Sequence, residues 1–218
     1  LVLQPRRVAA RATAARMSVE RQTKLGEEIG YRVRFESKVS KRTRIEVVTE
    51  GILLRRLLSD SFLDGVSVVV FDEFHERSLA SDLALGMVRQ VQEIRPELKV
   101  VVMSATLAAE PIARYLGNAP IIASEGRMFP VQIRYWPELE RRPSDEIAAA
   151  AVPEAFRETT GDCLVFLPGV GEIRNAARRL ETWAAEQNVL LMELYGDLPP
   201  AQQDAVLAPA AQRKVILT

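Results

Sequence analysis

The feature that most constrains the fold is an apolar segment, Val66–Phe71, that ends abruptly in two acids. The segment is about as long as one buried strand and is rich in valine. Asp72 and Glu73 follow it directly, and His75, the only histidine of the chain, comes two residues later. Ligands of open α/β sheets bind beyond the carboxyl ends of the strands. We therefore expect these acids to face a binding site and not a core.

A second apolar run, Lys99–Met103, ends at Ser104, and Thr106 follows. Between the two runs, apolar residues at helical spacing predict a helix: Leu79, Leu83, Met87, Val91 and Ile94. Strand, helix and strand in this order form a right-handed crossover with parallel strands. If the strands are adjacent, His75 and the hydroxyls of Ser104 and Thr106 meet at one edge of the sheet. There they can form hydrogen bonds that register movement between the two loops.

The two acids suit the hydrolysis of a phosphoanhydride. Asp72 can hold Mg²⁺, which prefers oxygen ligands and usually keeps several of its waters, so a contact through water is expected. Glu73 points elsewhere; it is a second candidate ligand and can orient and polarise an attacking water. A purely structural explanation also exists, because carboxylates are favoured near a helix N-terminus without any catalytic role.

Together these segments resemble the DEAH-type helicases of superfamily 2. Residues 72–75, Asp-Glu-Phe-His, resemble the Walker B motif of that family, and residues 104–106, Ser-Ala-Thr, resemble its coupling motif. Phe74 stands where alanine is usual, and with residues 76–79 it is similar to the bacterial HrpB-type branch. The resemblance implies ATP and Mg²⁺ as cofactors and catalytic roles for Asp72, Glu73, His75, Ser104 and Thr106.

The charge is distributed unevenly although the formal net charge is zero. Residues 1–44 contain twelve Lys and Arg but only four Glu, so this segment carries +8 and the remainder −8. Such asymmetry suggests a surface that meets a polyanion. Solvated helix faces would explain any single arginine equally well.

Three further segments resemble nucleic-acid-binding motifs of the family. Arg6 and Arg7 adjoin a predicted helix start, where amides favour anions, and resemble motif Ia, which contacts the RNA backbone. Thr49 can cap the next helix, and with Gly51 it also matches motif Ib; both interpretations stay open. Gly169 belongs to a strand-to-helix turn that resembles motif IV. Residues 30–36 alternate as in an exposed strand, in which Arg34 could also contact a nucleic-acid backbone.

The order of the motifs predicts an α/β protein of two RecA-like lobes, with mainly parallel sheets flanked by helices. We expect the first lobe over residues 1–124 and the second over 125–218, both incomplete, because each end of the chain reads as an interrupted strand. No glycine is followed by lysine, so the phosphate-binding G-x-x-x-x-G-K-[ST] loop is not in this sequence. In the family this loop lies upstream of Leu1, and motifs V and VI lie beyond Thr218.

The composition excludes several other classes. The single cysteine, Cys163, excludes an internal disulfide and fits a reducing compartment; with one histidine it also excludes a Cys/His zinc site within the chain. No run approaches the ~18 apolar residues of a membrane helix, so no membrane partner is expected. The resemblance implies the bacterial cytoplasm.

We therefore predict part of an ATP-dependent RNA helicase that couples ATP hydrolysis to translocation on RNA or its unwinding. The partner would be single-stranded RNA, held by sequence-independent backbone contacts, and the choice of RNA over DNA rests on the resemblance. The chain alone should be inactive. The alternative is a non-catalytic nucleic-acid-binding module. A hydrolase with a His75-based triad is not favoured, because neither Ser104 nor Ser78 lies in a Gly-x-Ser-x-Gly elbow.

Overall fold

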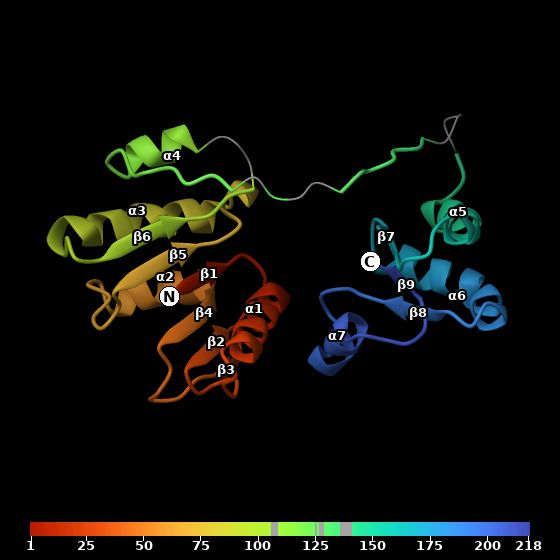
Figure 1. Cartoon of the computed structure of the whole chain (residues 1–218), viewed down its shortest axis with the longest axis horizontal. Coiled ribbons are helices and arrows are strands. Elements are labelled where there is room, and N and C mark those ends of the chain that lie inside the picture. Colours follow the sequence, from red (N-terminus) through yellow and green to blue (C-terminus); the bar gives the residue numbers. More distant parts are fainter. Residues whose placement is uncertain (106–108, 125, 127–128, 136–140) are drawn as a thin grey trace. The chain divides into compact units, whose positions relative to one another are not determined.

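The computed structural model describes residues 1–105, 109–124, 126, 129–135 and 141–218. The chain forms two compact units, Leu1–Arg127 and Met128–Thr218. The boundary predicted from the sequence lies after residue 124, three residues earlier. Each unit has a sheet with helices packed against it (Figure 1), so the predicted α/β class is confirmed.

The first unit contains a six-stranded sheet in the order β3-β2-β4-β1-β5-β6. Its strands are β1 (Val2–Gln4), β2 (Ile29–Val33), β3 (Glu36–Lys38), β4 (Ile45–Thr49), β5 (Val68–Phe71) and β6 (Lys99–Val102). Every neighbouring pair is parallel except β2 and β3. The carboxyl ends of β1, β2, β4, β5 and β6 therefore meet along one side, which we call the carboxyl edge.

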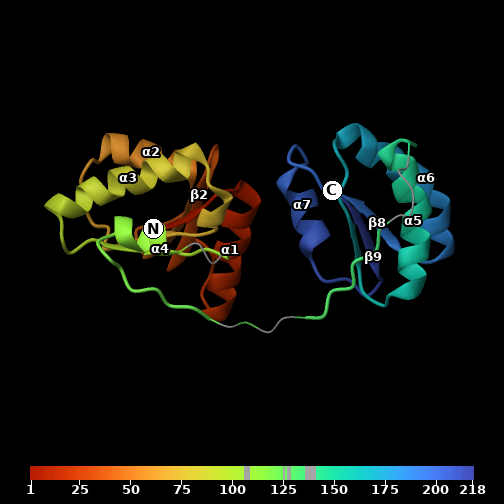
Figure 2. The same ribbon diagram turned by 90° about the horizontal axis from the view of Figure 1, so that it is seen from above.

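Helices cover both faces of this sheet (Figure 2): α1 (Arg7–Glu20), α2 (Glu50–Ser59), α3 (Leu79–Ile94) and the short α4 (Glu110–Tyr115). Successive residues of a strand point to opposite faces. Val47 accordingly packs with Ala10 and Ala14 of α1, whereas Val48 packs in a second core with residues of α2 and α3. The central strands are thus buried on both faces.

The expectation of an exposed strand over residues 30–36 is wrong. β2 lies inside the sheet between β3 and β4, so Tyr31 and Val33 are buried. Gly30 is required by this packing, because a Cβ there would lie 2.3 Å from the carbonyl oxygen of Lys38. The polar positions of the alternating pattern are Arg32 and Arg34, and they do not mean that the strand faces solvent.

Helix α3 occupies the predicted range but buries a different face. Three residues of the apolar stripe that predicts it, Leu79, Leu83 and Ile94, are 86%, 53% and 67% exposed. The residues that face the sheet are Ser81, Ala84, Leu85, Val88 and Val91. The helix carries two apolar stripes, and spacing alone does not determine which one packs.

The second unit contains a parallel three-stranded sheet in the order β7-β9-β8. Its elements are α5 (Ser144–Glu158), β7 (Cys163–Val165), α6 (Val170–Glu186), β8 (Leu190–Glu193), α7 (Pro200–Leu207) and β9 (Lys214–Leu217). Helices α5 and α6 share a core with one face of the sheet, and α7 lies on the opposite side (Figure 2). None of the described helices of either unit is long and apolar enough to cross a membrane.

Two cations at the start of β9 fix the ends of helices in this unit. The Arg213 guanidinium donates to the carbonyls of Phe156 and Gly161 and lies 3.4 Å from the centre of the Phe156 ring. The buried Lys214 ammonium donates to the carbonyls of Val206 and Ala208. Carbonyls at a helix C-terminus lack intrahelical donors, so these contacts satisfy groups that burial would otherwise penalise.

We predict that Phe74→Ala destabilises the first unit although it creates the residue that is usual in the motif. Phe74 is 3% exposed and packs edge to face on Phe71, with ring centres 6.1 Å apart. Its truncation should lower the free energy of unfolding by about 3 kcal/mol through the cavity it leaves. Urea unfolding followed by circular dichroism measures this change.

The fluorescence of Trp183, which packs against the core of the second unit, should keep the transition midpoint of the unsubstituted chain. Phe62→Ala is the control, because Phe62 is 50% exposed and should lose less than about 1 kcal/mol. Equal losses for the two variants would contradict the assignment of Phe74 to the core.

Candidate functional site

The predicted catalytic acids lie at the carboxyl edge in a short turn after β5. We call Asp72–Arg77 the acidic turn. It contains a single 3-10 turn, Phe74–Glu76, and the residues on either side of that turn, Glu73 and Arg77, have left-handed φ angles of 52° and 49°. Non-glycine residues adopt this conformation only where surrounding contacts compensate for the strain.

Phe74 supplies one of those contacts. Its ring is buried in the core beneath the turn, and its N–H donates to the carbonyl of Met103, just after β6, at 3.0 Å. Arg77, at the other end of the turn, donates two hydrogen bonds to Asp82, at 3.1 and 2.9 Å. These bonds raise the pKa of Arg77 above its ordinary value. The backbone of the turn is thus held to β6 and to α3.

Asp72 is oriented by two hydrogen bonds. Its Oδ2 accepts from Nε2 of Gln4 at 2.5 Å, and its Oδ1 accepts from the N–H of Glu73 at 2.9 Å. Gln4 ends β1, the neighbour of β5, and is 3% exposed. This role for Gln4 was not predicted from the sequence. A polar side chain at the end of a buried central strand must find a partner, and that rule could have pointed to the acid on the next strand.

His75 joins the tips of β5 and β6. Its Nδ1 accepts a hydrogen bond from the N–H of Ala105 at 3.2 Å, and its Nε2 lies 3.4 Å from Oε2 of Glu73. Because Nδ1 accepts this hydrogen bond, the ring hydrogen lies on Nε2, which faces the Glu73 carboxylate. One side chain therefore contacts both a predicted catalytic acid and the loop after β6.

The structure brings together four of the five residues predicted for catalysis. Asp72, Glu73 and His75 lie in one turn, and Ser104 precedes the alanine that donates to His75. Thr106 lies outside the described residues. Among the described residues, no group of three or more His, Cys, Asp or Glu is arranged to hold a metal ion, so a cation here would depend on the two acids and on water.

The predicted nucleic-acid contacts of the first unit lie along the same edge. Arg6 follows β1 and Arg7 begins α1; both are exposed, and Arg6 forms an ion pair with Glu76 of the acidic turn at 3.3 Å. Thr49 occupies the N-cap position of α2 but makes no capping hydrogen bond with its side chain. A Cβ at Gly51 would meet nothing within 4 Å, so the fold itself does not require glycine there. Gly169 lies in the second unit, at the N-cap of α6.

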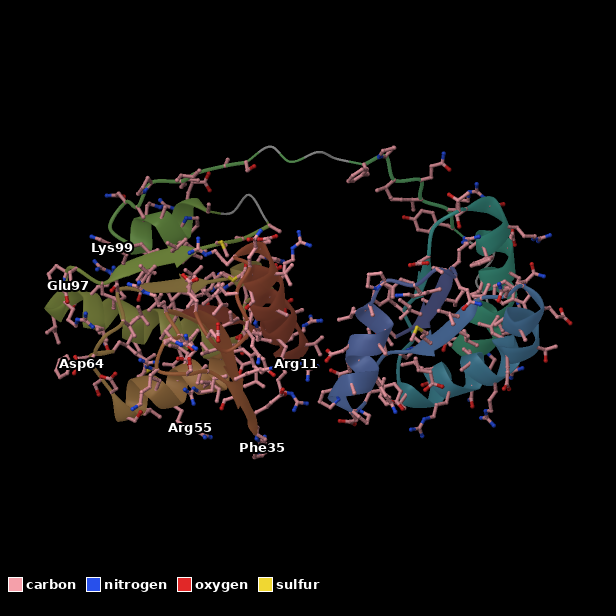
Figure 3. All side chains as sticks on the ribbon, turned by 60° about the horizontal axis from the view of Figure 1, so that its bottom comes forward. Arg11, Phe35, Arg55, Asp64, Glu97 and Lys99 are labelled. Carbon is pink, nitrogen blue, oxygen red and sulfur yellow. The ribbon has the colours of Figure 1, made fainter. Side chains whose placement is uncertain are left out.

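The turn between β2 and β3 adds an exposed aromatic ring that was not predicted from the sequence. Phe35 is 90% exposed with a φ of 67°, and the Arg34 guanidinium lies 4.7 Å from the centre of its ring. Figure 3 shows Phe35 at the tip of this hairpin. Ile52 and Arg55 of α2 and residues 32–37 line a shallow cavity of about 350 Å³ beside it. Three arginines and an accessible ring thus line one cavity between the β2–β3 turn and α2.

A parallel sheet with oriented acids at its carboxyl edge is typical of nucleotide-binding α/β domains. A family model described as DEAD/DEAH box helicase matches residues 1–114, more than half of the chain. The chain therefore belongs to the DEAD/DEAH box helicase family.

The similarity extends over both units. The chain is 44% identical over 220 residues to the ATP-dependent RNA helicase HrpB of Escherichia coli K12, covering 100% of this chain and 27% of that protein. It is 38% identical over 217 residues to an ATP-dependent RNA helicase HrpA homolog of Haemophilus influenzae, covering 98% and 17%. A crystal structure of E. coli DEAH/RHA helicase HrpB superimposes with a TM-score of 0.88, covering 100% and 28% at 44% identity.

These findings confirm the predicted family and the predicted fold, including its HrpB-type character. The chain spans about a quarter of the length of E. coli HrpB and less than a fifth of the HrpA homolog.

We predict that His75→Ala releases the amide of Ala105. Ala105 is exposed, so its N–H is protected from exchange chiefly by the hydrogen bond to Nδ1. Its hydrogen-exchange rate, measured by NMR, should rise toward that of an unstructured peptide. The amide of Phe74 is the internal control, because its backbone bond to Met103 does not involve the imidazole.

His75→Asn is the matched variant for this experiment. The amide oxygen of asparagine can take the place of Nδ1 as an acceptor, so part of the protection should return. Fast exchange of the Ala105 amide already in the unsubstituted chain would contradict the link between the two strand tips.

Proposed function

We propose that this chain is part of an ATP-dependent RNA helicase in which ATP hydrolysis drives translocation on RNA or its unwinding. The observation that carries the proposal is the contact between strand tips: His75 bonds to the loop after β6 and faces Glu73 at the tip of β5. A motor needs such a contact, because a conformational change at the hydrolytic acids must be transmitted to other parts of the protein.

In this proposal the two acids have separate tasks. Gln4 and the Glu73 amide fix the Asp72 carboxylate, so that it can hold Mg²⁺ through water. The donor set fits this cation, since two carboxylates leave most positions to water and phosphate oxygens. The bound Mg²⁺ would offset negative charge on the phosphates. Glu73, about half exposed at its side chain, is free to turn from His75 and orient the attacking water.

His75, Ser104 and Thr106 would connect hydrolysis with the grip on RNA. The hydrogen bond from Ala105 ties the loop of Ser104 to the acidic turn, so that a shift of Glu73 alters the partner of the imidazole. Thr106 keeps its role in the proposal on the basis of the motif alone.

RNA would be held along the carboxyl edge by backbone contacts. Arg6 and Arg7 are exposed cations beside the start of α1, and Thr49 and Gly51 leave the start of α2 open to a sugar–phosphate chain. Phe35 offers a ring on which a base can stack, with Arg34 beside it. Gly169 would contribute the corresponding turn of the second unit. Such contacts give binding that is independent of base sequence and sensitive to salt.

The chain by itself should not hydrolyse ATP at an appreciable rate. Hydrolysis by this class needs a lysine-containing loop around the β- and γ-phosphates, and no glycine in this sequence is followed by lysine. RNA, as opposed to DNA, is favoured by the relatives, which are ATP-dependent RNA helicases. Tests of activity therefore require a full-length protein that contains this chain.

We predict that Glu73→Gln in the full-length protein abolishes ATP hydrolysis stimulated by RNA. Loss of a group that orients the attacking water should lower the turnover number by about 100-fold or more. Affinity for single-stranded RNA should remain, because Glu73 is not among the proposed backbone contacts. A coupled ATPase assay and fluorescence anisotropy measure the two quantities.

Glu93→Gln is the matched control, since Glu93 is an exposed acid on α3 away from the acidic turn. It should leave the turnover number unchanged. A Glu73→Gln variant with the turnover number of the unsubstituted protein would favour a nucleic-acid-binding module without catalysis.

We predict that Arg6→Ala and Arg7→Ala weaken RNA binding by removing phosphate contacts. Each contact that is lost should reduce the slope of log K against log salt by about 0.7 for single-stranded nucleic acid. Binding isotherms at a series of KCl concentrations give this slope. Arg16→Ala is the control, because Arg16 lies on the same helix but pairs with Glu20. An equal slope for all three variants would exclude Arg6 and Arg7 from the RNA contact.

A further inference from the structure

Glu50 bridges the starts of two helices of the first unit. It is the first residue of α2, between Thr49 and Gly51, and its Oε1 accepts hydrogen bonds from Oγ of Ser78 at 2.5 Å and from Oγ of Ser81 at 3.0 Å. Ser78 is the N-cap of α3 and accepts from the N–H of Ser81 at 2.9 Å. One carboxylate oxygen therefore holds both hydroxyls of the first turn of α3.

The two helix starts joined in this way belong to different parts of the proposed machinery. The start of α2 carries the RNA-binding candidates Thr49 and Gly51. Ser78 follows the acidic turn directly, so its position limits where Arg77 and the residues before it can lie. Glu50 touches neither ATP nor RNA in the proposal, yet it lies between the residues that do.

The backbone of the acidic turn is of the kind that responds to such a restraint. Two left-handed non-glycine residues, Glu73 and Arg77, flank its single 3-10 turn. Strained conformations of this type persist only when the surroundings hold them. The buried ring of Phe74 anchors the turn from below, and the bond between Ser78 and Glu50 anchors the residue immediately after it.

A second contact runs in the same direction. Glu76, within the acidic turn, forms an ion pair with Arg6, which is one of the two arginines predicted to contact phosphate. That pair is exposed and is therefore weak on its own. The bonds of Glu50 are better shielded, because Ser81 is only 7% exposed. Of the two carboxylates, Glu50 is therefore the one whose hydrogen bonds can transmit a displacement of the start of α2 to the acidic turn.

We propose that Glu50 is a positioning residue that couples RNA binding at the start of α2 to the geometry of the acidic turn. RNA that settles on Thr49 and Gly51 fixes the first turn of α2, and Glu50 then holds Ser78 and the strained turn in the conformation needed for hydrolysis. The inference rests on the proposed helicase function and adds a route that is independent of His75.

The test uses the full-length protein and compares three variants. Glu50→Ala removes the acceptor, whereas Glu50→Gln retains an oxygen that can accept from both hydroxyls. Glu46→Ala is the control for a purely structural effect, because Glu46 pairs with Arg56 of α2 and with Arg32 but has no bond to the acidic turn. The readout is the ratio of the ATPase turnover number with saturating single-stranded RNA to that without RNA.

Glu50→Ala should lower this ratio by about five- to tenfold, the lower range of coupling between two sites. Glu50→Gln should recover most of the ratio, and Glu46→Ala should leave it unchanged. Ser81→Ala, which removes one of the two bonds, should lower the ratio in the same direction by a smaller factor. If Glu50→Ala fails to fold, the ratio measured for Ser81→Ala tests the proposal instead.

An unchanged ratio in Glu50→Ala, or in Ser81→Ala where the first variant does not fold, would overturn the inference. An equal loss in Glu46→Ala would also overturn it, because the effect would then follow from general loosening of α2. If the unsubstituted protein shows no stimulation by RNA, the proposed function itself fails. The outcomes of the two proposals are thus separable.

Discussion

The first unit depends on how the acidic turn is held at the tip of β5. The turn contains two left-handed non-glycine residues, and without tertiary contacts it would relax. Phe74 provides the largest of these contacts, since its ring enters the core and its amide bonds to Met103 after β6. His75 then reaches Ala105 from a backbone that is already fixed. The contacts of Phe74 therefore stabilise the core and fix the geometry of the site at the same time.

The mostly parallel sheet would allow the proposed nucleotide and nucleic-acid functions to share one edge. Parallel strands all deliver the residues that follow them to the same side, so segments far apart in sequence meet there. Arg6 after β1, Thr49 at the end of β4 and Asp72 after β5 lie along the carboxyl edge. Side chains then connect these segments directly: Gln4 to Asp72, and Arg6 to Glu76. In our proposal these bonds connect the grip on RNA to the acids.

The sequence predicted the order of strands and helices well, because apolar runs and turn residues are local signals. The prediction failed where the structure depends on contacts between elements that are distant in the sequence. Spacing found α3 but not its buried face, since Leu79 and Leu83 form an apolar stripe that stays exposed. The motif found Asp72 but not Gln4, because partners across neighbouring strands are set by sheet order. Thr49 fell at the predicted N-cap without forming the capping bond.

The central claim is that ATP and RNA act on one connected structure. Its most direct test is the dissociation constant of single-stranded RNA for the full-length protein, measured with Mg²⁺ and a non-hydrolysable ATP analogue and again without nucleotide. Because coupling between sites is reciprocal, the account predicts that the nucleotide changes this constant by about fivefold or more. Equal dissociation constants at saturating nucleotide would contradict it.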